Sequence, residues 1–239
     1  MQLIQRLGSN ISDEYVDNYI KLILDNPGSC DNVWIPTSYG FPPLEKHKEF
    51  AGFWTKSAEK LRKNGIGVSM QISNTIGHGS FTNADCTGLV YEGSPAEKIV
   101  GFDGITSEKC FCWRGKNFRK YIVESMSYYV EGIKPESVWI DDDFRVINHS
   151  PVKFGCFCDD CMEKFNTLHN TSFSRKQLAD EILYGEIKWR ESFVDFLREG
   201  MYDFMYEIGK AIHNLSPKTV LGYQSCSNGG YDGYGSSYI

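Results

Sequence analysis

The sequence has no apolar run that approaches the roughly 20 residues of a membrane-spanning helix, so we expect no membrane partner. It also lacks an excess of positive charge: 25 Lys and Arg residues stand against 31 Asp and Glu residues, a formal net charge of −6. Nucleic acid is therefore not an expected partner either. The segment MQLIQRLGSN lacks the apolar core of a secretory signal, which predicts a cytoplasmic protein.

The composition is typical of a globular protein. Hydrophobic residues make up 41% and charged residues 23% of the 239 positions, which is enough for a substantial core. Eight cysteines are present, and their clustering favours reduced thiols or a metal site over disulfides. We see no internal repeat or linker, and we expect residues 1–239 to form a single domain.

Strand and helix patterns alternate along the chain. Five segments have the pattern of short strands: Leu3 to Leu7, Val33 to Thr37, Gly67 to Ser73, Val138 to Asp142 and Thr219 to Ser225. Other segments repeat apolar residues at helical spacing: Val16 to Leu24, Glu45 to Lys63, Phe118 to Val130, a segment around Phe165, Leu178 to Tyr184, and Trp189 to Ile212. This alternation predicts an α/β fold with a parallel sheet.

The third predicted strand has one apolar and one polar face, since Val68, Met70 and Ile72 alternate with Ser69, Gln71 and Ser73. An open parallel sheet is normally apolar on both faces, whereas a barrel interior becomes polar at its active-site end. We therefore favour a TIM-type (β/α)8 barrel over an open doubly wound sheet. We expect this barrel to be incomplete, with about five βα units and with long loops after the third and fourth strands.

Two motifs lie close together in the second half of the chain. The fourth predicted strand ends in three acids, Asp141, Asp142 and Asp143. Asp141 and Asp143 share a strand face, and like charges close together raise a carboxyl pKa, as a general acid requires. The alternative is a structural acid cluster that caps the next helix or binds Arg145.

The second motif is a cysteine cluster with the spacing C-x-C-x-x-C, formed by Cys156, Cys158 and Cys161. Structural zinc takes four tetrahedral ligands, and Cys110 or Cys112 can supply the fourth. Four thiolates leave no open position for a catalytic water, so we expect a structural zinc. The alternative is a group of unmetallated thiols.

These motifs resemble those of family 42 β-galactosidases and related barrel glycosidases. The matching segments, between Cys110 and Trp189, are CWRGKNFR from Cys112, WIDDDF from Trp139, and CFCDDC from Cys156. The resemblance implies a barrel glycoside hydrolase in which Asp143 is the acid/base, Asp141 or Asp142 orients it or binds a sugar hydroxyl, and Cys112 is the fourth zinc ligand. Asp142 stands where the family has Asn, and Asp143 stands where it has the catalytic Glu.

We therefore expect a glycoside hydrolase-like protein with Asp143 and Asp141 as catalytic residues and a carbohydrate as substrate. The expected substrate-binding residues are Asp142, Gln71, Asn74, His78, Trp113 and Gln224. A non-catalytic carbohydrate-binding barrel and a zinc-dependent hydrolase remain as alternatives. Five strands would leave two open sheet edges, which favours self-association into a homo-oligomer.

Overall fold

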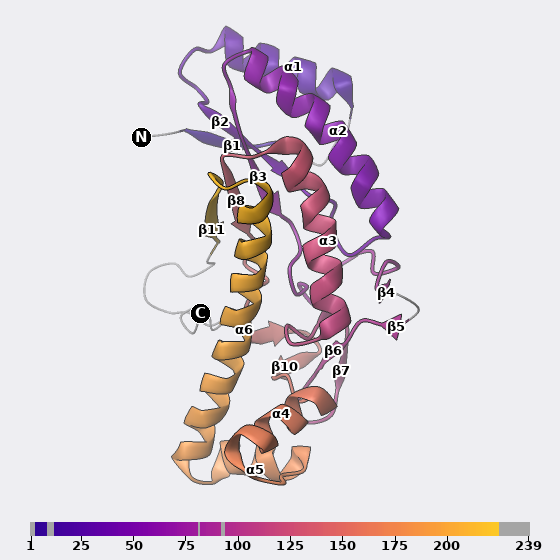
Figure 1. Ribbon diagram of the computed structural model, residues 1–239, viewed down its shortest axis with the longest axis vertical. Coiled ribbons are helices and arrows are strands. Elements are labelled where there is room, and N and C mark those ends of the chain that lie inside the picture. The colour runs from indigo at the N-terminus through magenta and orange to yellow at the C-terminus, as the bar shows by residue number, and fades with distance from the viewer. Residues whose placement is uncertain (1–2, 9–11, 81, 92–93, 225–239) are drawn as a thin grey trace.

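The computed structural model describes residues 3–8, 12–80, 82–91 and 94–224 (Figure 1). Five parallel strands form its main sheet: β1 (Ile4–Arg6), β2 (Asn32–Pro36), β3 (Gly67–Ile72), β8 (Ser137–Ile140) and β11 (Val220–Tyr223). Their spatial order is β1-β2-β3-β8-β11, which is also their order along the chain. The five strands predicted from the sequence are therefore confirmed as neighbours in one parallel sheet.

Six helices accompany the sheet in the described ranges: α1 (Asp13–Asp25), α2 (Leu44–Lys63), α3 (Lys116–Ile133), α4 (Asp159–His169), α5 (Arg175–Tyr184) and α6 (Ile187–Leu215). Figure 1 shows α2, α3 and α6 side by side along the strands, and α2 and α6 each contact α3. None of these helices combines the length and the apolar character needed to cross a bilayer.

Local sequence explains where the first helix begins. The Ser12 hydroxyl accepts a hydrogen bond from the Tyr15 N–H at 3.1 Å, which satisfies one of the free amide groups of the first turn. Asp13 and Glu14 then place negative charge at the positive end of the helix dipole. Val16, Ile20 and Ile23 recur at helical spacing, and all three are buried.

The two faces of the sheet differ as the sequence predicts. Val68 and Met70 of β3 are fully buried in the apolar core shared with the helices. On the opposite face, the Ser137 hydroxyl donates to Ser69 at 2.8 Å. Trp34 and Trp139 lie beside these hydroxyls with ring centroids 5.1 Å apart. At the carboxyl ends of the strands, this face carries further polar side chains.

Two long loops follow β3 and β8, as expected, but they contain short antiparallel strands that the sequence analysis did not predict. The first loop holds β4 (Val90–Tyr91), β5 (Ser94–Pro95), β6 (Lys98–Val100) and β7 (Thr106–Phe111). The second holds β9 (Ile147–His149), β10 (Val152–Phe154), α4 and α5. Figure 1 shows β6, β7, β10, α4 and α5 beyond the same end of α3, so parts of both loops lie together there.

Candidate functional site

A polar network joins the carboxyl ends of four strands. The Gln71 side-chain amide donates to Asp141 Oδ1 at 3.1 Å and to Gln224 Oε1 at 2.9 Å. Gln71 Oε1 in turn accepts from Arg6 Nε at 2.7 Å. These residues belong to β3 and to the ends of β8, β11 and β1, so the sheet brings together directly hydrogen-bonded side chains up to 153 positions apart.

His78 approaches this network from the loop after β3. Its Nε2 lies 3.1 Å from Asp141 Oδ2, and its Nδ1 lies 3.9 Å from Asp142 Oδ1. The side chains of His78, Asp141 and Asp142 are 17%, 16% and 33% exposed, so all three open to solvent. Burial acts to lower the pKa of His78, but its hydrogen bond to Asp141 and the charges of the nearby acids raise that pKa to about 9.

The backbone around His78 is built from conformations that only glycine adopts without strain. Gly77 and Gly79 flank His78 and have φ angles of 114° and 104°. A Cβ on Gly77 would lie 2.1 Å from the carbonyl oxygen of Lys109, so the neighbouring chain also requires glycine there. Tyr39, which is 46% exposed, stacks on the His78 ring at 6.2 Å with an interplanar angle of 17°.

Asp143 occupies a different place from the one predicted. Its side chain is 0% exposed, and its Oδ2 accepts hydrogen bonds from the backbone N–H groups of Thr75, Ile76 and Gly77 at 2.6, 2.9 and 2.7 Å. Its Oδ1 has no hydrogen-bond partner within the described part of the chain. Burial raises the pKa of this carboxyl, an effect opposed by His78 and by the backbone amides. Asp143 therefore ties two loops together and does not face the site.

His149 strengthens the same loop connection. It is buried, with Nδ1 3.0 Å from the Gly77 carbonyl oxygen and Nε2 2.7 Å from that of Arg145. Burial lowers the pKa of His149 to about 4. A neutral ring donates to one of these oxygens, so the other contact is held by the surrounding packing. Through Asp143 and His149, the segment after β8 fixes the turn that carries His78.

Three further expectations about substrate contacts have different outcomes. Trp113 is 0% exposed, so its ring packs in the core and cannot stack on a sugar in this structure. Asn74 is 4% exposed, and its Oδ1 accepts from the Gly40 N–H at 2.8 Å, so it fastens a neighbouring loop. Asp142 lies near the site with its Oδ1 3.7 Å from Arg145 Nη1, so the predicted Arg145 pairing involves Asp142.

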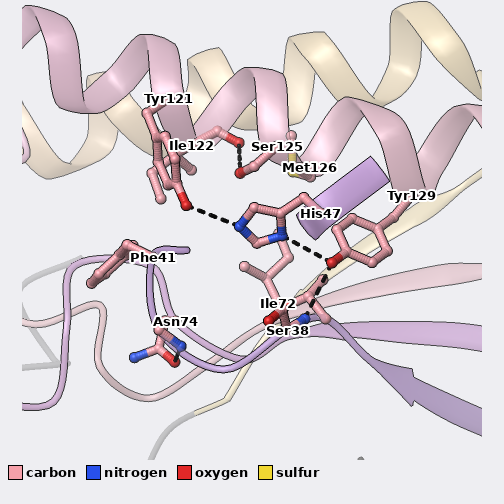
Figure 2. Close-up of a pocket in the computed structure, with 12 residues that line it drawn as sticks. Ser38, Phe41, His47, Ile72, Asn74, Tyr121, Ile122, Ser125, Met126 and Tyr129 are labelled. Atoms are coloured by element: carbon pink, nitrogen blue, oxygen red, sulfur yellow. Dashed lines mark hydrogen bonds between the residues drawn. The ribbon is translucent and has the colours of Figure 1, made fainter. Parts of the chain in front are cut away.

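A second buried polar cluster lies between α2, α3 and the loop after β2 (Figure 2). The His47 ring nitrogens lie 2.9 Å from the hydroxyls of Tyr129 and Tyr121. The Tyr129 oxygen accepts from the Ser38 N–H at 3.2 Å, and the Tyr121 hydroxyl donates to the Pro42 carbonyl. The adjoining cavity of about 10 Å³ has room for at most one water, so this cluster holds the loop and does not bind a substrate.

The cysteine cluster forms as the sequence predicts. The sulfur atoms of Cys112, Cys156, Cys158 and Cys161 all lie within 4.8 Å of one another. Cys112 Sγ is 3.6 Å from Cys161 Sγ and 3.8 Å from Cys158 Sγ. A tetrahedral zinc with bonds of about 2.3 Å separates its sulfur ligands by about 3.8 Å, so the spacing fits zinc. Cys112 lies in the loop before α3, Cys156 and Cys158 lie in the loop before α4, and Cys161 lies in the first turn of α4.

Cys110, the alternative fourth ligand, lies outside this cluster and places its Sγ 3.2 Å from the Gly77 carbonyl oxygen. Within the cluster, hydrogen bonds from the other thiols lower the pKa of Cys158. The equivalent bonds, together with burial, raise the pKa of Cys112. A divalent metal bound here would hold the cysteines as thiolates.

The sequence analysis missed two residues of the site. Arg6 ends β1 and bonds to Gln71, and Tyr39 follows β2 and covers His78. Both lie at or just after the carboxyl end of a predicted strand. The same rule that singled out Gln71 and Gln224 would have found Arg6 and Tyr39 as well.

No protein-family model and no curated protein sequence matches the chain. Solved structures do match it. β-Galactosidase from Bacillus circulans sp. alkalophilus gives a TM-score of 0.57 at 11% sequence identity, over 93% of this chain and 36% of that one. The PgaB (BpsB) glycoside hydrolase domain from Bordetella bronchiseptica gives 0.58 at 10% identity, over 93% and 65%. A catalytic mutant of Gan42B, a GH42 β-galactosidase from G. stearothermophilus, gives 0.59 at 9% identity, over 93% and 35%.

This chain therefore spans 36%, 65% and 35% of the length of these three structures. At sequence identities of 9–11%, structural similarity supports a shared fold and nothing finer. The described α/β structure, with its five-stranded parallel sheet, shares its fold with part of these glycoside hydrolases.

Proposed function

We propose that this chain is the first part of a TIM-type barrel that binds and hydrolyses a carbohydrate, with residues 1–239 as one partial barrel domain. The observation that carries the proposal is the network of Asp141, His78, Gln71 and Gln224 at the carboxyl ends of parallel strands. Barrel enzymes place their reacting groups at this end of the sheet. The fold shared with three glycoside hydrolase structures supports the same assignment.

Asp141 is the carboxylate on which we expect acid–base chemistry to depend. It lies at the end of β8, is 16% exposed, and contacts both His78 and Gln71. The resemblance to family 42 assigned that role to Asp143, but a buried carboxyl that accepts three backbone hydrogen bonds does not reach a substrate. Asp143 instead supports the site by holding the loop of His78.

The other polar groups are suited to binding sugar hydroxyls. Asp142 offers oxygen acceptors, and Gln224, whose Oε1 accepts from Gln71, offers its amide N–H groups as donors. The exposed ring of Tyr39 offers an apolar surface beside them. Glycoside hydrolysis also requires a second carboxylate. The ends of β1, β2, β3 and β11 carry none among the described residues, so we expect it from another part of the barrel.

We further propose a structural zinc held by Cys112, Cys156, Cys158 and Cys161. When bound, it would fasten the loop before α3 to the start of α4. Four thiolates fill the tetrahedral set, so this site does not favour the alternative of a zinc-dependent hydrolase. The other alternative is a barrel that binds carbohydrate without cleaving it. The burial of Asp143 favours this alternative, because Asp143 stands at the position that the family resemblance gives to the acid/base and does not reach a substrate.

A comparison of binding and hydrolysis tests these functions. The full-length protein is assayed on a panel of nitrophenyl glycosides, and saccharide binding is measured by calorimetry. We expect Asp141→Asn to lower kcat by roughly 10²–10⁴-fold, the usual contribution of acid–base catalysis. Asp180→Asn on α5, an exposed partner of Lys176, serves as the matched control and should behave as wild type.

Three outcomes are distinct. Hydrolysis that depends on Asp141 supports the glycosidase. Binding that weakens on substitution of Gln71 or Asp142, without any hydrolysis by the wild type, supports the non-catalytic barrel. Failure to bind or hydrolyse any saccharide would show that the proposed function is wrong.

A further inference from the structure

The two nitrogens of His78 have different environments. Nε2 lies at hydrogen-bond distance, 3.1 Å, from Asp141 Oδ2. Nδ1 lies 3.9 Å from the nearest oxygen of Asp142, which is too long for a hydrogen bond. Asp141 thus fixes the orientation of the ring, while the Nδ1–H faces Asp142 at ion-pair distance and makes no hydrogen bond to it. Catalytic histidines paired with a carboxylate divide their nitrogens in this way.

The surrounding chain holds this ring in a defined position. Gly77 and Gly79 form the turn that projects it, and Tyr39 covers one face. Asp143 binds three amides of the same loop, and His149 contacts the Gly77 carbonyl. A side chain that only served as a hydroxyl contact would not require so many supports, whereas proton transfer needs a donor placed within a few tenths of an ångström.

We propose that His78 is the proton carrier of the reaction, transferring a proton from Nδ1 to the departing oxygen, with Asp141 as its positioning residue. This inference rests on the proposed glycosidase function. As the bond between the anomeric carbon and the glycosidic oxygen breaks, its electron pair stays on the oxygen, which takes the Nδ1 proton. Water then adds to the anomeric carbon, and its released proton returns to the neutral imidazole. The net reaction consumes one water and restores His78.

The charges around His78 suit this role. The negative charges of Asp141, Asp142 and the buried Asp143 lie near it, and together with the hydrogen bond to Asp141 they outweigh the cost of burial. The pKa of His78 is consequently raised to about 9, so that the ring carries its proton at neutral pH. The nearby His149 is neutral at neutral pH because burial lowers its pKa to about 4. Burial raises the pKa of Tyr39, so its hydroxyl is also neutral. Neither residue therefore adds a charge beside His78.

His78, Asp141 and Asp142 also place a nitrogen and two oxygens within 4.8 Å of one another, a spacing that a cation can bridge. An imidazolium cannot be a metal ligand, so the two interpretations make opposite predictions. Assays in the presence of EDTA separate them. Full hydrolysis with EDTA, or a loss that zinc alone restores through the cysteine site, agrees with the proton carrier, and a loss that magnesium or manganese restores would overturn it.

The decisive experiment varies the leaving group. An aryl glycoside with a dinitrophenyl group needs no proton, whereas a methyl or phenyl glycoside does. In the full-length protein, we expect His78→Asn to lower kcat/KM for the phenyl glycoside by roughly 10²–10⁴-fold and to change that for the dinitrophenyl glycoside by less than about tenfold. His213→Asn, a substitution of an exposed histidine on α6, is the matched control.

The pH profile adds a readout that a purely structural role would not move. Wild-type kcat/KM for the phenyl glycoside should fall as the pH rises through about 9, and this limb should be absent in His78→Asn. Equal losses on both substrates, or an unchanged alkaline limb, would overturn the assignment while leaving the glycosidase proposal intact. A wild-type protein that hydrolyses no glycoside would overturn both.

A measurement on the 239-residue chain itself requires no turnover. Nitrogen-15 NMR titration should show both His78 nitrogens protonated at neutral pH, with the transition near pH 9, and Asp141→Asn should move that transition toward the ordinary histidine value. A wild-type transition at or below that ordinary value would show that the pair does not hold a proton for transfer.

Discussion

Replacing Asp143 with Ala removes the acceptor of three consecutive backbone hydrogen bonds in the loop after β3. The N–H groups of Thr75, Ile76 and Gly77 all point at Oδ2, at 2.6, 2.9 and 2.7 Å. The site is fully buried, so water does not replace the lost acceptor without entering the core. The substitution therefore leaves three donors unsatisfied at once, in the loop that carries His78.

The magnitude follows from the cost of burying an unsatisfied donor, which is roughly 1–3 kcal/mol for each group. Partial relaxation of the loop and the relief of burying a carboxyl lower the total. We expect Asp143→Ala to reduce the free energy of unfolding by about 4 kcal/mol, a shift of roughly 8–16 °C in Tm for a chain of this size. Asp143→Asn keeps one carbonyl oxygen for the same three amides, so it should cost only about 1 kcal/mol.

Urea unfolding followed by circular dichroism measures both variants against wild type. The hydrogen exchange rates of the Thr75, Ile76 and Gly77 amides localise the effect, because these amides should lose protection in the Ala variant and keep it in the Asn variant. A loss below about 1 kcal/mol for Asp143→Ala, or equal losses for the two variants, would contradict the hydrogen-bonding role.

Two further predictions concern the zinc site and the pH dependence of stability. Wild-type protein purified without chelator should contain about one zinc per chain by metal analysis. Cys158→Ser should lose most of this zinc and also lose stability, whereas Cys86→Ser, outside the cluster, should lose neither. A metal-free, well-folded wild type would disprove the site. Since the folded-state pKa of His78 is raised from 6.5 to about 9, the stability from its pairing with Asp141 is fully present below pH 6.5 and is lost as the pH rises through 9. The destabilisation caused by Asp141→Asn should therefore be larger at pH 6 than at pH 10 in urea unfolding, and a difference that does not vary with pH would contradict the pairing.

The regular elements were predictable because their signals are local. The helical run from Val16 to Leu24 lies within α1, and the predicted strand from Gly67 to Ser73 differs from β3 by one residue. Apolar side chains at a period of two or 3.6 residues must share a face, whatever the rest of the chain does. The short strand pairs in the two long loops lack such a period, and the sequence analysis did not find them.

The site was predictable in part. The carboxyl ends of parallel strands meet at one edge of a sheet, so strand assignment was enough to place Gln71, Asp141 and Gln224 together. The cysteine cluster followed from its spacing, and Cys112 lies in it as the family resemblance implied. Trp113 was misassigned to the site because its position in a long loop gave no sign that the loop folds back and buries it.

The position of Asp143 could not be predicted from the sequence. The alternation of strand faces placed it beside Asp141, but β8 ends at Ile140, and Asp142 and Asp143 lie in a turn where the period of two no longer holds. The sequence by itself determined the alternation of strands and helices, the polar strand ends and three of the four clustered cysteines. Only the tertiary structure decided which acid faces solvent beside His78 and which is buried against backbone amides about 67 positions away, because irregular loops meet through long-range contacts that no local pattern records.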